Sequence, residues 1–218
     1  MAVRTKKTGT GHSMAPTAKK TKIREEVAAL KRERTIGVAV DLFYEKGYVN
    51  ATLDDVADRL SVTKPFIYAN FGSKNELLCE ICLRGVMAAM RALDDVLEFE
   101  LGPAETLRLF ITRYVAAILE HQKQIAVYTR EEKNLGPAEA QKLADLRKSF
   151  VAKLTAIIEK GKIEGEFNVK DPTMAALAIV GAVSWSTFWY HPDGRLSTSE
   201  IIQNMTHLLM ALAGLQRG

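Results

Sequence analysis

Residues that bind metals or carry out redox chemistry are scarce in this sequence. Its 218 residues include two cysteines, Cys79 and Cys82, and four widely separated histidines. Two cysteines cannot form a disulfide framework or a four-cysteine zinc site within one chain, and none of the histidines belongs to a recognised metal or catalytic motif. We therefore expect no catalytic residues, no metal and no cofactor. These scarcities argue against an enzyme.

The C-x-x-C spacing of Cys79 and Cys82 has two interpretations. On a helix, positions i and i+3 share one face, which suits burial of both side chains as small apolar groups. A redox switch is the alternative, although no β-α-β pattern of the thioredoxin type surrounds the pair.

A secretory signal is also missing, since no charged segment is followed by an apolar run and a small-residue cleavage site. The nearest approach to a membrane span is 174–190, which lacks charge but is short and contains Ser184, Ser186 and Thr187. A helix buried on nearly every side, as at a subunit interface, explains this segment better. We expect a cytoplasmic protein that does not contact a membrane.

Acidic residues are absent from the first 24 positions, which carry seven lysines and arginines. The rest of the chain is close to neutral, because the formal net charge is only +4. Such a polar segment cannot bury enough apolar surface to fold, so residues 1–24 are expected to form a disordered basic arm. This arm either screens DNA phosphates or stays a solvated tail.

Sustained period-2 alternation, the mark of half-buried strands, does not occur either. Apolar residues recur instead at helical spacing almost everywhere, so the predicted fold class is all-α. Glycine and proline pairs separate the segments. The predicted helices begin at about Glu25 or Lys31 and end at Lys46, and then cover 52–60, 63–71, 73–99, 104–121, 123–133, 137–161, 172–190 and 198–214.

Two short helices stand close together near the N-terminus. Thr52 is a good N-cap for the first, and Thr63 caps the second, with Pro65 in the first turn where its missing N–H is tolerated. A tight connection between two such helices is the helix-turn-helix unit. Ser73 caps the next helix, with Glu76 at the position that completes a capping box.

Residues 35–78 (TIGVAVDLFYEKGYVNATLDDVADRLSVTKPFIYANFGSKNELL) resemble the DNA-binding domain of the TetR family. The shared features include Gly47-Tyr48, the Thr52 cap, Asp55-Val56-Ala57, Val62-Thr63-Lys64, Ile67-Tyr68-x-x-Phe71 and Ser73-Lys74-x-x-Leu77-Leu78. The resemblance implies a three-helix DNA-binding domain at 25–75 and a larger helical ligand-binding and dimerisation domain at 76–218. It further implies a homodimer that binds a double-stranded operator and responds to a small-molecule effector.

The family resemblance also assigns roles to individual residues. The DNA-binding residues it implies are Thr52, Thr63, Lys64, Pro65, Phe66, Tyr68, Asn70 and Lys74. Thr52 and Lys74 occupy phosphate-contacting positions, and the third helix is expected in the major groove. The alternatives are a plain cap for Thr52, a solvated charge for Lys74, and packing against Thr52 or the first helix for Tyr68. Phe66 and Asn70 depart from the family pattern, in which a small residue and histidine are common.

The second half of the chain resembles the family only in architecture. Candidate ligand-binding residues are Met87, Tyr114, Tyr128, Arg130, Trp185 and Phe188, and ordinary core packing is the alternative for each. The stretches 130–135 and 189–195 are faintly similar to regulators of lipid and steroid catabolism that respond to acyl-CoA thioesters. The helices at 172–190 and 198–214 resemble the pair through which family members dimerise; burial in a monomer is the alternative.

Overall fold

The computed structural model describes residues 15–215, with side chains from residue 21 onward, and confirms an all-α fold. Within this range it contains nine α-helices, one 3₁₀ helix and no named strand. The helices are α1 (Ala15–Lys46), α2 (Leu53–Leu60), α3 (Lys64–Phe71), α4 (Lys74–Leu97), α5 (Pro103–Glu120), α6 (Gln122–Glu131), η1 (Glu132–Asn134), α7 (Pro137–Ile163), α8 (Pro172–Trp189) and α9 (Thr198–Leu212).

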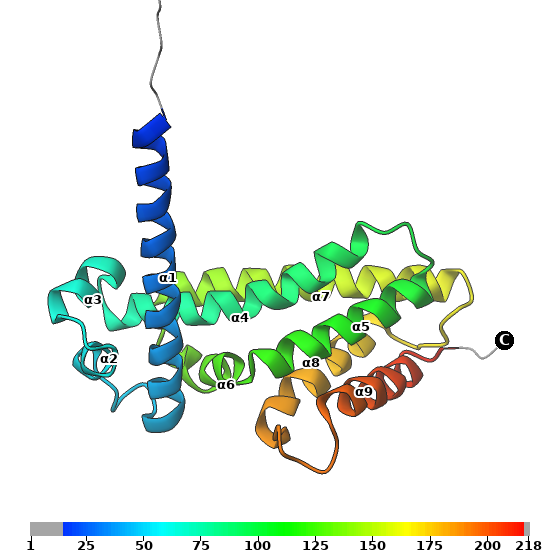
Figure 1. Cartoon of the computed structure of the whole chain (residues 1–218). Helices are drawn as coiled ribbons and strands as arrows, with labels where there is room; N and C mark the ends of the chain where they lie inside the picture. Colours follow the sequence, from blue (N-terminus) through cyan, green and yellow to red (C-terminus); the bar gives the residue numbers. More distant parts are fainter. Residues whose placement is uncertain (1–14, 216–218) are drawn as a thin grey trace, which may run out of the picture.

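The helices form a small head and a longer body (Figure 1). Helices α2 and α3 pack with part of α1 at one end of the molecule, and α4 runs from this head along the body. Helices α5 to α9 complete the body, where α5 contacts α4, α7, α8 and α9. One continuous set of buried apolar residues, from Ile36 to Ala213, connects the two parts.

The first helix is longer than the sequence predicts. It begins at Ala15 rather than at Glu25 or Lys31, so the prediction of a disordered arm is wrong for residues 15–24, while residues 1–14 lie outside the described range. Alanine, lysine and arginine make up most of residues 15–24 and favour helix even without apolar surface to bury. As a result, the N-terminal half of α1 projects beyond the other helices (Figure 1).

Local hydrogen bonds fix the helix-turn-helix. The Thr52 hydroxyl accepts a bond from the Asp55 amide at 3.0 Å, and the Asp55 carboxylate accepts one from the Thr52 amide at 2.7 Å. This reciprocal pair is a complete capping box at the start of α2. Ser61 then adopts a left-handed backbone, with φ of 55°, and turns the chain into α3. Ser73 caps α4 through the Glu76 amide, but only this half of the predicted box forms.

Helix α8 is the one described helix long and apolar enough to cross a membrane by length and composition. One such helix is weak evidence for a span, because a helix at a protein interface passes the same test. Within the single chain α8 is not buried on every side, since Met174 and Trp185 are about three-fifths exposed. Exposed apolar side chains on α9, Leu208 and Leu212, accompany them.

Candidate DNA-binding surface and effector cavity

Helix α3 has one buried face and one exposed face. Ile67 and Phe71, four residues apart, are buried against the head, as their spacing predicts. Tyr68 is 52% exposed, so a large part of its side chain is accessible to DNA. Lys64, Pro65 and Asn70 are also exposed. The outer face of α3 therefore presents a cation, a phenol and an amide, groups that can contact bases or phosphates in a major groove.

Two of these side chains already have partners within the head. The Lys64 ammonium lies 2.5 Å from an Asp54 carboxylate oxygen, and this hydrogen bond raises the pKa of Lys64. The Asn70 amide donates to the Phe66 carbonyl at 2.7 Å. Both bonds are exposed to solvent, so either side chain can exchange its partner for DNA at little cost.

Phe66 is half-buried rather than directed outward. Its ring packs against the core of the head, and the Lys31 ammonium of α1 lies 5.7 Å from the ring centroid. This contact explains why a large residue is tolerated where the family pattern has a small one. Thr63 is the N-cap of α3, but its side chain makes no capping hydrogen bond there.

Lys74 lies at the start of α4, beside the loop that precedes α2. Its ammonium donates to the Val49 carbonyl at 3.3 Å and lies 4.2 Å from the centroid of the Tyr48 ring. Partial burial lowers the pKa of Lys74. The side chain is therefore held in place by the protein instead of moving freely in solvent.

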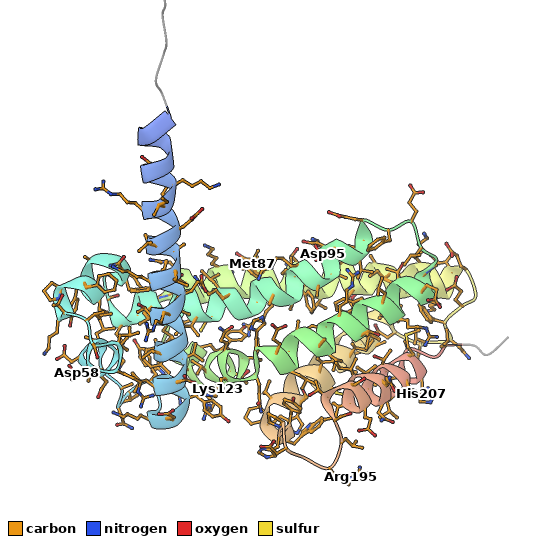
Figure 2. The ribbon with its side chains drawn as sticks, in the orientation of Figure 1. Asp58, Met87, Asp95, Lys123, Arg195 and His207 are labelled. Carbon is orange, nitrogen blue, oxygen red and sulfur yellow. The ribbon has the colours of Figure 1, made fainter. Side chains whose placement is uncertain are left out.

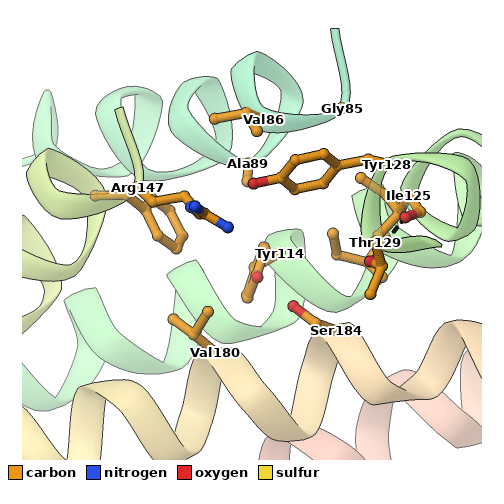
Figure 3. A pocket seen from close by; sticks show the side chains of 12 residues that line it. Gly85, Val86, Ala89, Tyr114, Ile125, Tyr128, Thr129, Arg147, Val180 and Ser184 are labelled. Carbon is orange, nitrogen blue, oxygen red and sulfur yellow. Dashed lines mark hydrogen bonds between the residues drawn. The ribbon is translucent and has the colours of Figure 1, made fainter. Parts of the chain in front are cut away.

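A cavity lies in the body among α4, α5, α6, α7 and α8 (Figure 3). Its volume is about 90 Å³. Cavities of ~150 Å³ hold a benzene molecule, so this one suits an apolar group of a few carbon atoms. The lining residues are Gly85, Val86, Ala89, Tyr114, Ile118, Ile125, Tyr128, Thr129, Arg147, Phe150, Val180 and Ser184.

Polar groups occupy defined places in this apolar cavity. The Tyr128 hydroxyl is buried and, among the residues that the structure describes, has no hydrogen-bond partner. Burial raises the pKa of Tyr128, and it raises the pKa of Tyr114 to about 12, so both phenols stay neutral donors. The Arg147 guanidinium lies 5.8 Å from the Tyr128 ring and pairs with Glu132 at 2.8 Å. A buried phenol without a partner and an adjacent cation can bind a ligand oxygen.

Only two of the predicted ligand residues, Tyr114 and Tyr128, line this cavity. Met87 is exposed on α4 (Figure 2), and Trp185 and Phe188 stack together on the exposed face of α8 with ring centroids 4.5 Å apart. Arg130 lies 4.7 Å from the ring centroid of Tyr44 on α1. These four residues lie outside this cavity, because residue type alone does not show which helix face a side chain occupies.

Arg147 is the charged residue among the cavity residues that sequence analysis did not single out. It stands four residues after Leu143 and three before Phe150, both buried, so it shares their face of α7. A charged residue within an apolar stripe was the available signal.

Gly85 is important for helix packing beside the cavity, because a Cβ at this position would lie 2.8 Å from the Ile125 side chain. It allows α4 and α6 to approach each other beside the cavity.

The two cysteines lie on α4 near the head. Cys82 is completely buried, and burial raises the pKa of its thiol to about 12. Cys79 is half-buried, and burial raises the pKa of its thiol as well. Thiols with raised pKa values react slowly, which favours the packing interpretation over the redox switch.

A helix-turn-helix with an exposed second helix, joined to a helical body with its own cavity, defines a class: a DNA-binding regulator with a receptor domain. Comparison with known proteins identifies the family. Residues 36–81 match the model of bacterial regulatory proteins of the tetR family, and residues 100–213, more than half of the chain, match the tetracyclin repressor-like C-terminal domain. The chain belongs to the TetR family of transcriptional regulators.

Individual relatives are similar over most of their length. The transcriptional repressor KstR2 of Mycobacterium tuberculosis is 25% identical over 190 residues, which cover 86% of this chain and 94% of the relative. The crystal structure of PfmR from Thermus thermophilus has 30% identity and a TM-score of 0.76, covering 84% of this chain and 100% of that one. AibR, solved with isovaleryl coenzyme A and operator DNA, has 23% identity and a TM-score of 0.72, covering 81% and 98%.

Proposed function

We propose that this protein is a homodimeric repressor that binds a palindromic operator and is released from it by a small, largely apolar effector. The observation that carries the proposal is the presence, in one continuous core, of an outward-facing α3 and a cavity with an unpartnered polar group. An operator-binding role corresponds to a cytoplasmic protein without enzymatic activity.

The DNA-binding unit of this proposal is 25–75, and the ligand-binding and dimerisation unit is 76–218. Tyr68 and Asn70, with Lys64 and Pro65, contact base edges or the backbone from α3, and Thr52, Thr63 and Lys74 contact phosphates. Phe66 supports α3 from the inside. The four α3 residues are exposed, and Lys74 is held in a fixed position; both observations support these roles.

Helices α8 and α9 form the proposed dimer interface. Large apolar side chains are exposed along both helices, and such a contiguous face is unusual on a monomer. The exposed residues are Met174, Leu177, Trp185, Phe188, Trp189, Leu208 and Leu212. A twofold contact would cover this face and carry the two heads as a pair, which matches the symmetry of a palindromic site.

An acyl-CoA thioester is the proposed effector. The 90 Å³ cavity suits a short acyl group, whose carbonyl can accept a hydrogen bond from Tyr128. A wider groove of about 810 Å³ between α7 and α8 shares Arg147, Phe150 and Val180 with the cavity and also contains Lys148. These two cations are placed to bind phosphates of the coenzyme. The AibR complex with isovaleryl coenzyme A, in a protein of the same fold, supports this choice.

Contacts between α6 and the head suggest how the effector acts. Ile125, Tyr128 and Thr129 of α6 line the cavity. A few residues further on, Glu131 accepts a hydrogen bond from the Tyr48 amide at 3.3 Å. Asn75 at the start of α4 donates to the Asn134 carbonyl of η1 at 2.7 Å. A ligand that displaces α6 would therefore shift the head through both α1 and α4.

Calorimetry tests the effector. A short acyl-CoA is titrated into the free protein and into its complex with a duplex selected by the protein from a random library. We expect weaker binding to the complex, with a coupling of ~1–3 kcal/mol. Equal affinity for both forms contradicts release, and binding of the free acid without binding of the thioester contradicts the acyl-CoA assignment.

A matched pair of variants locates the effector site. Ala89→Met places a longer side chain in the cavity, whereas Ala138→Met changes an exposed residue of α7. The cavity variant should still bind the selected duplex but lose acyl-CoA binding at least tenfold, and the exposed variant should behave as wild type. Unchanged acyl-CoA binding by Ala89→Met would exclude this cavity as the site.

A further inference from the structure

A basic hollow lies in the head between α1 and α3, away from the face of α3 discussed above. Its volume is about 360 Å³, and Lys31 and Arg34 of α1 border it together with Thr63 and Phe66. Both cations are exposed. The site is concave, positively charged and solvent-accessible, which are the properties of a site for an anion.

The charged groups around the hollow differ in whether they have partners. Arg32 and Glu33, on the side of α1 toward α4, pair with Glu80 and Arg84 respectively. Within the described range, Lys31 and Arg34 form no ion pair, and the Thr63 hydroxyl makes no capping bond. The hollow therefore presents two cations and a hydroxyl that are available to an external ligand.

The positive charge continues along the projecting part of α1. Arg24 precedes Lys31 by seven residues, which is nearly two helical turns, so both lie on one face about 10 Å apart along the axis. Arg24 is exposed, and the described side chains provide it with no ion-pair partner. We call Arg24, Lys31 and Arg34 the α1 basic stripe.

The direction of the stripe suggests its ligand. In Figure 1, the projecting half of α1 extends from the head on the side opposite α8 and α9. If α8 and α9 form the dimer interface, as proposed above, this side points away from the partner protomer. The projecting half of α1 would then run along the DNA away from the dimer axis, beyond the half-site that α3 contacts.

We propose that the α1 basic stripe and the hollow bind backbone phosphates of the DNA that flanks each half-site on its outer side. Lys31, Arg34 and Thr63 hold phosphates at the edge of the half-site, and Arg24 binds one further out. The contact adds affinity for any flanking sequence, because phosphates carry no base information. This inference depends on the proposed operator binding and extends the footprint of each head.

Salt dependence of DNA binding tests the proposal. The probe is a duplex selected by the wild-type protein from a random library, in a short form ending at the half-sites and a long form with about ten further base pairs, roughly one helical turn, on each side. The double variant Lys31→Gln, Arg34→Gln is compared with Lys160→Gln, Lys162→Gln, which removes the same charge from exposed positions at the end of α7.

Each lost phosphate contact reduces the slope of log K against log salt by about 0.9. On the long duplex we expect the slope for the Lys31, Arg34 double variant to be smaller than that of wild type by about 1.8 per protomer. The slope for the α7 control should match wild type. Arg24→Gln cannot disturb the packing of α3. Its slope should be smaller than that of wild type by about 0.9 per protomer on the long duplex and unchanged on the short one.

The proposal is overturned if wild type binds the long and short duplexes with the same affinity and slope, or if the α1 variants match the α7 control on the long duplex. Failure to select any duplex would instead overturn the operator-binding function itself. A melting temperature within a few degrees of wild type, measured for each variant, shows that the head is folded.

Discussion

Lys74 connects the start of α4 with the loop before α2. Its ammonium has one hydrogen bond, to the Val49 carbonyl, and the Tyr48 ring covers one side. An ammonium has three donors, so two remain for other acceptors. Because the side chain is already positioned, a phosphate contact would cost less side-chain entropy than one from a free surface lysine.

Replacing Lys74 tests this role. We expect Lys74→Gln to weaken binding to the selected duplex and to random DNA by the same factor and to reduce the salt slope by about 0.9 per protomer. Fluorescence anisotropy at several salt concentrations measures both quantities, with Lys170→Gln, an exposed lysine of the body, as the control. Unaltered affinity and slope would show that Lys74 only fastens the loop to α4.

At the scale of helices, α6 contacts both the cavity and the head. Besides the Glu131 bond, the Arg130 guanidinium packs on the Tyr44 ring, and Lys123 pairs with Asp41 at 2.5 Å. All three contacts join α6 to the C-terminal half of α1 or the residues just after it. Helix α4 alone is therefore not the connection between receptor and head.

Breaking these contacts should uncouple the two sites. We expect the double variant Arg130→Gln, Glu131→Gln to bind the selected duplex and the acyl-CoA separately, but to lose at least half of the coupling free energy between them. The exposed Lys133→Gln of η1 serves as the control. Titration of the acyl-CoA into free and DNA-bound protein gives the coupling. Full coupling in the double variant would exclude the α6 contacts as the connection.

Local sequence signals predicted where the helices of the head begin, whereas the position of the cavity depends on long-range packing. Thr52, Thr63 and Ser73 marked helix starts correctly, because capping depends on residues within one turn. The cavity could not be predicted in the same way. It requires α4 to α8 to converge, and hydrophobicity alone does not show that Trp185 is exposed or that Arg147, an exposed residue, also borders the cavity.

For the whole molecule, the exposed face of α8 and α9 decides whether the heads act as a pair. We expect Trp185→Glu to convert the protein into monomers at micromolar concentration, because a carboxylate would be buried in an apolar contact without a partner. Ile163→Glu introduces the same charge at a residue of α7 that is 78% exposed and should leave the dimer intact. Sedimentation velocity distinguishes the two, and a dimeric Trp185→Glu variant would place the interface elsewhere.

The mass of the protein–DNA complex tests the central claim most directly. Wild-type protein is mixed with the duplex it selects from a random library, and the complex is measured by light scattering after size exclusion. The account predicts enrichment of a sequence with twofold symmetry, and two chains, or a multiple of two, on each duplex. Selection of no sequence above background, or one chain on each duplex, would contradict it.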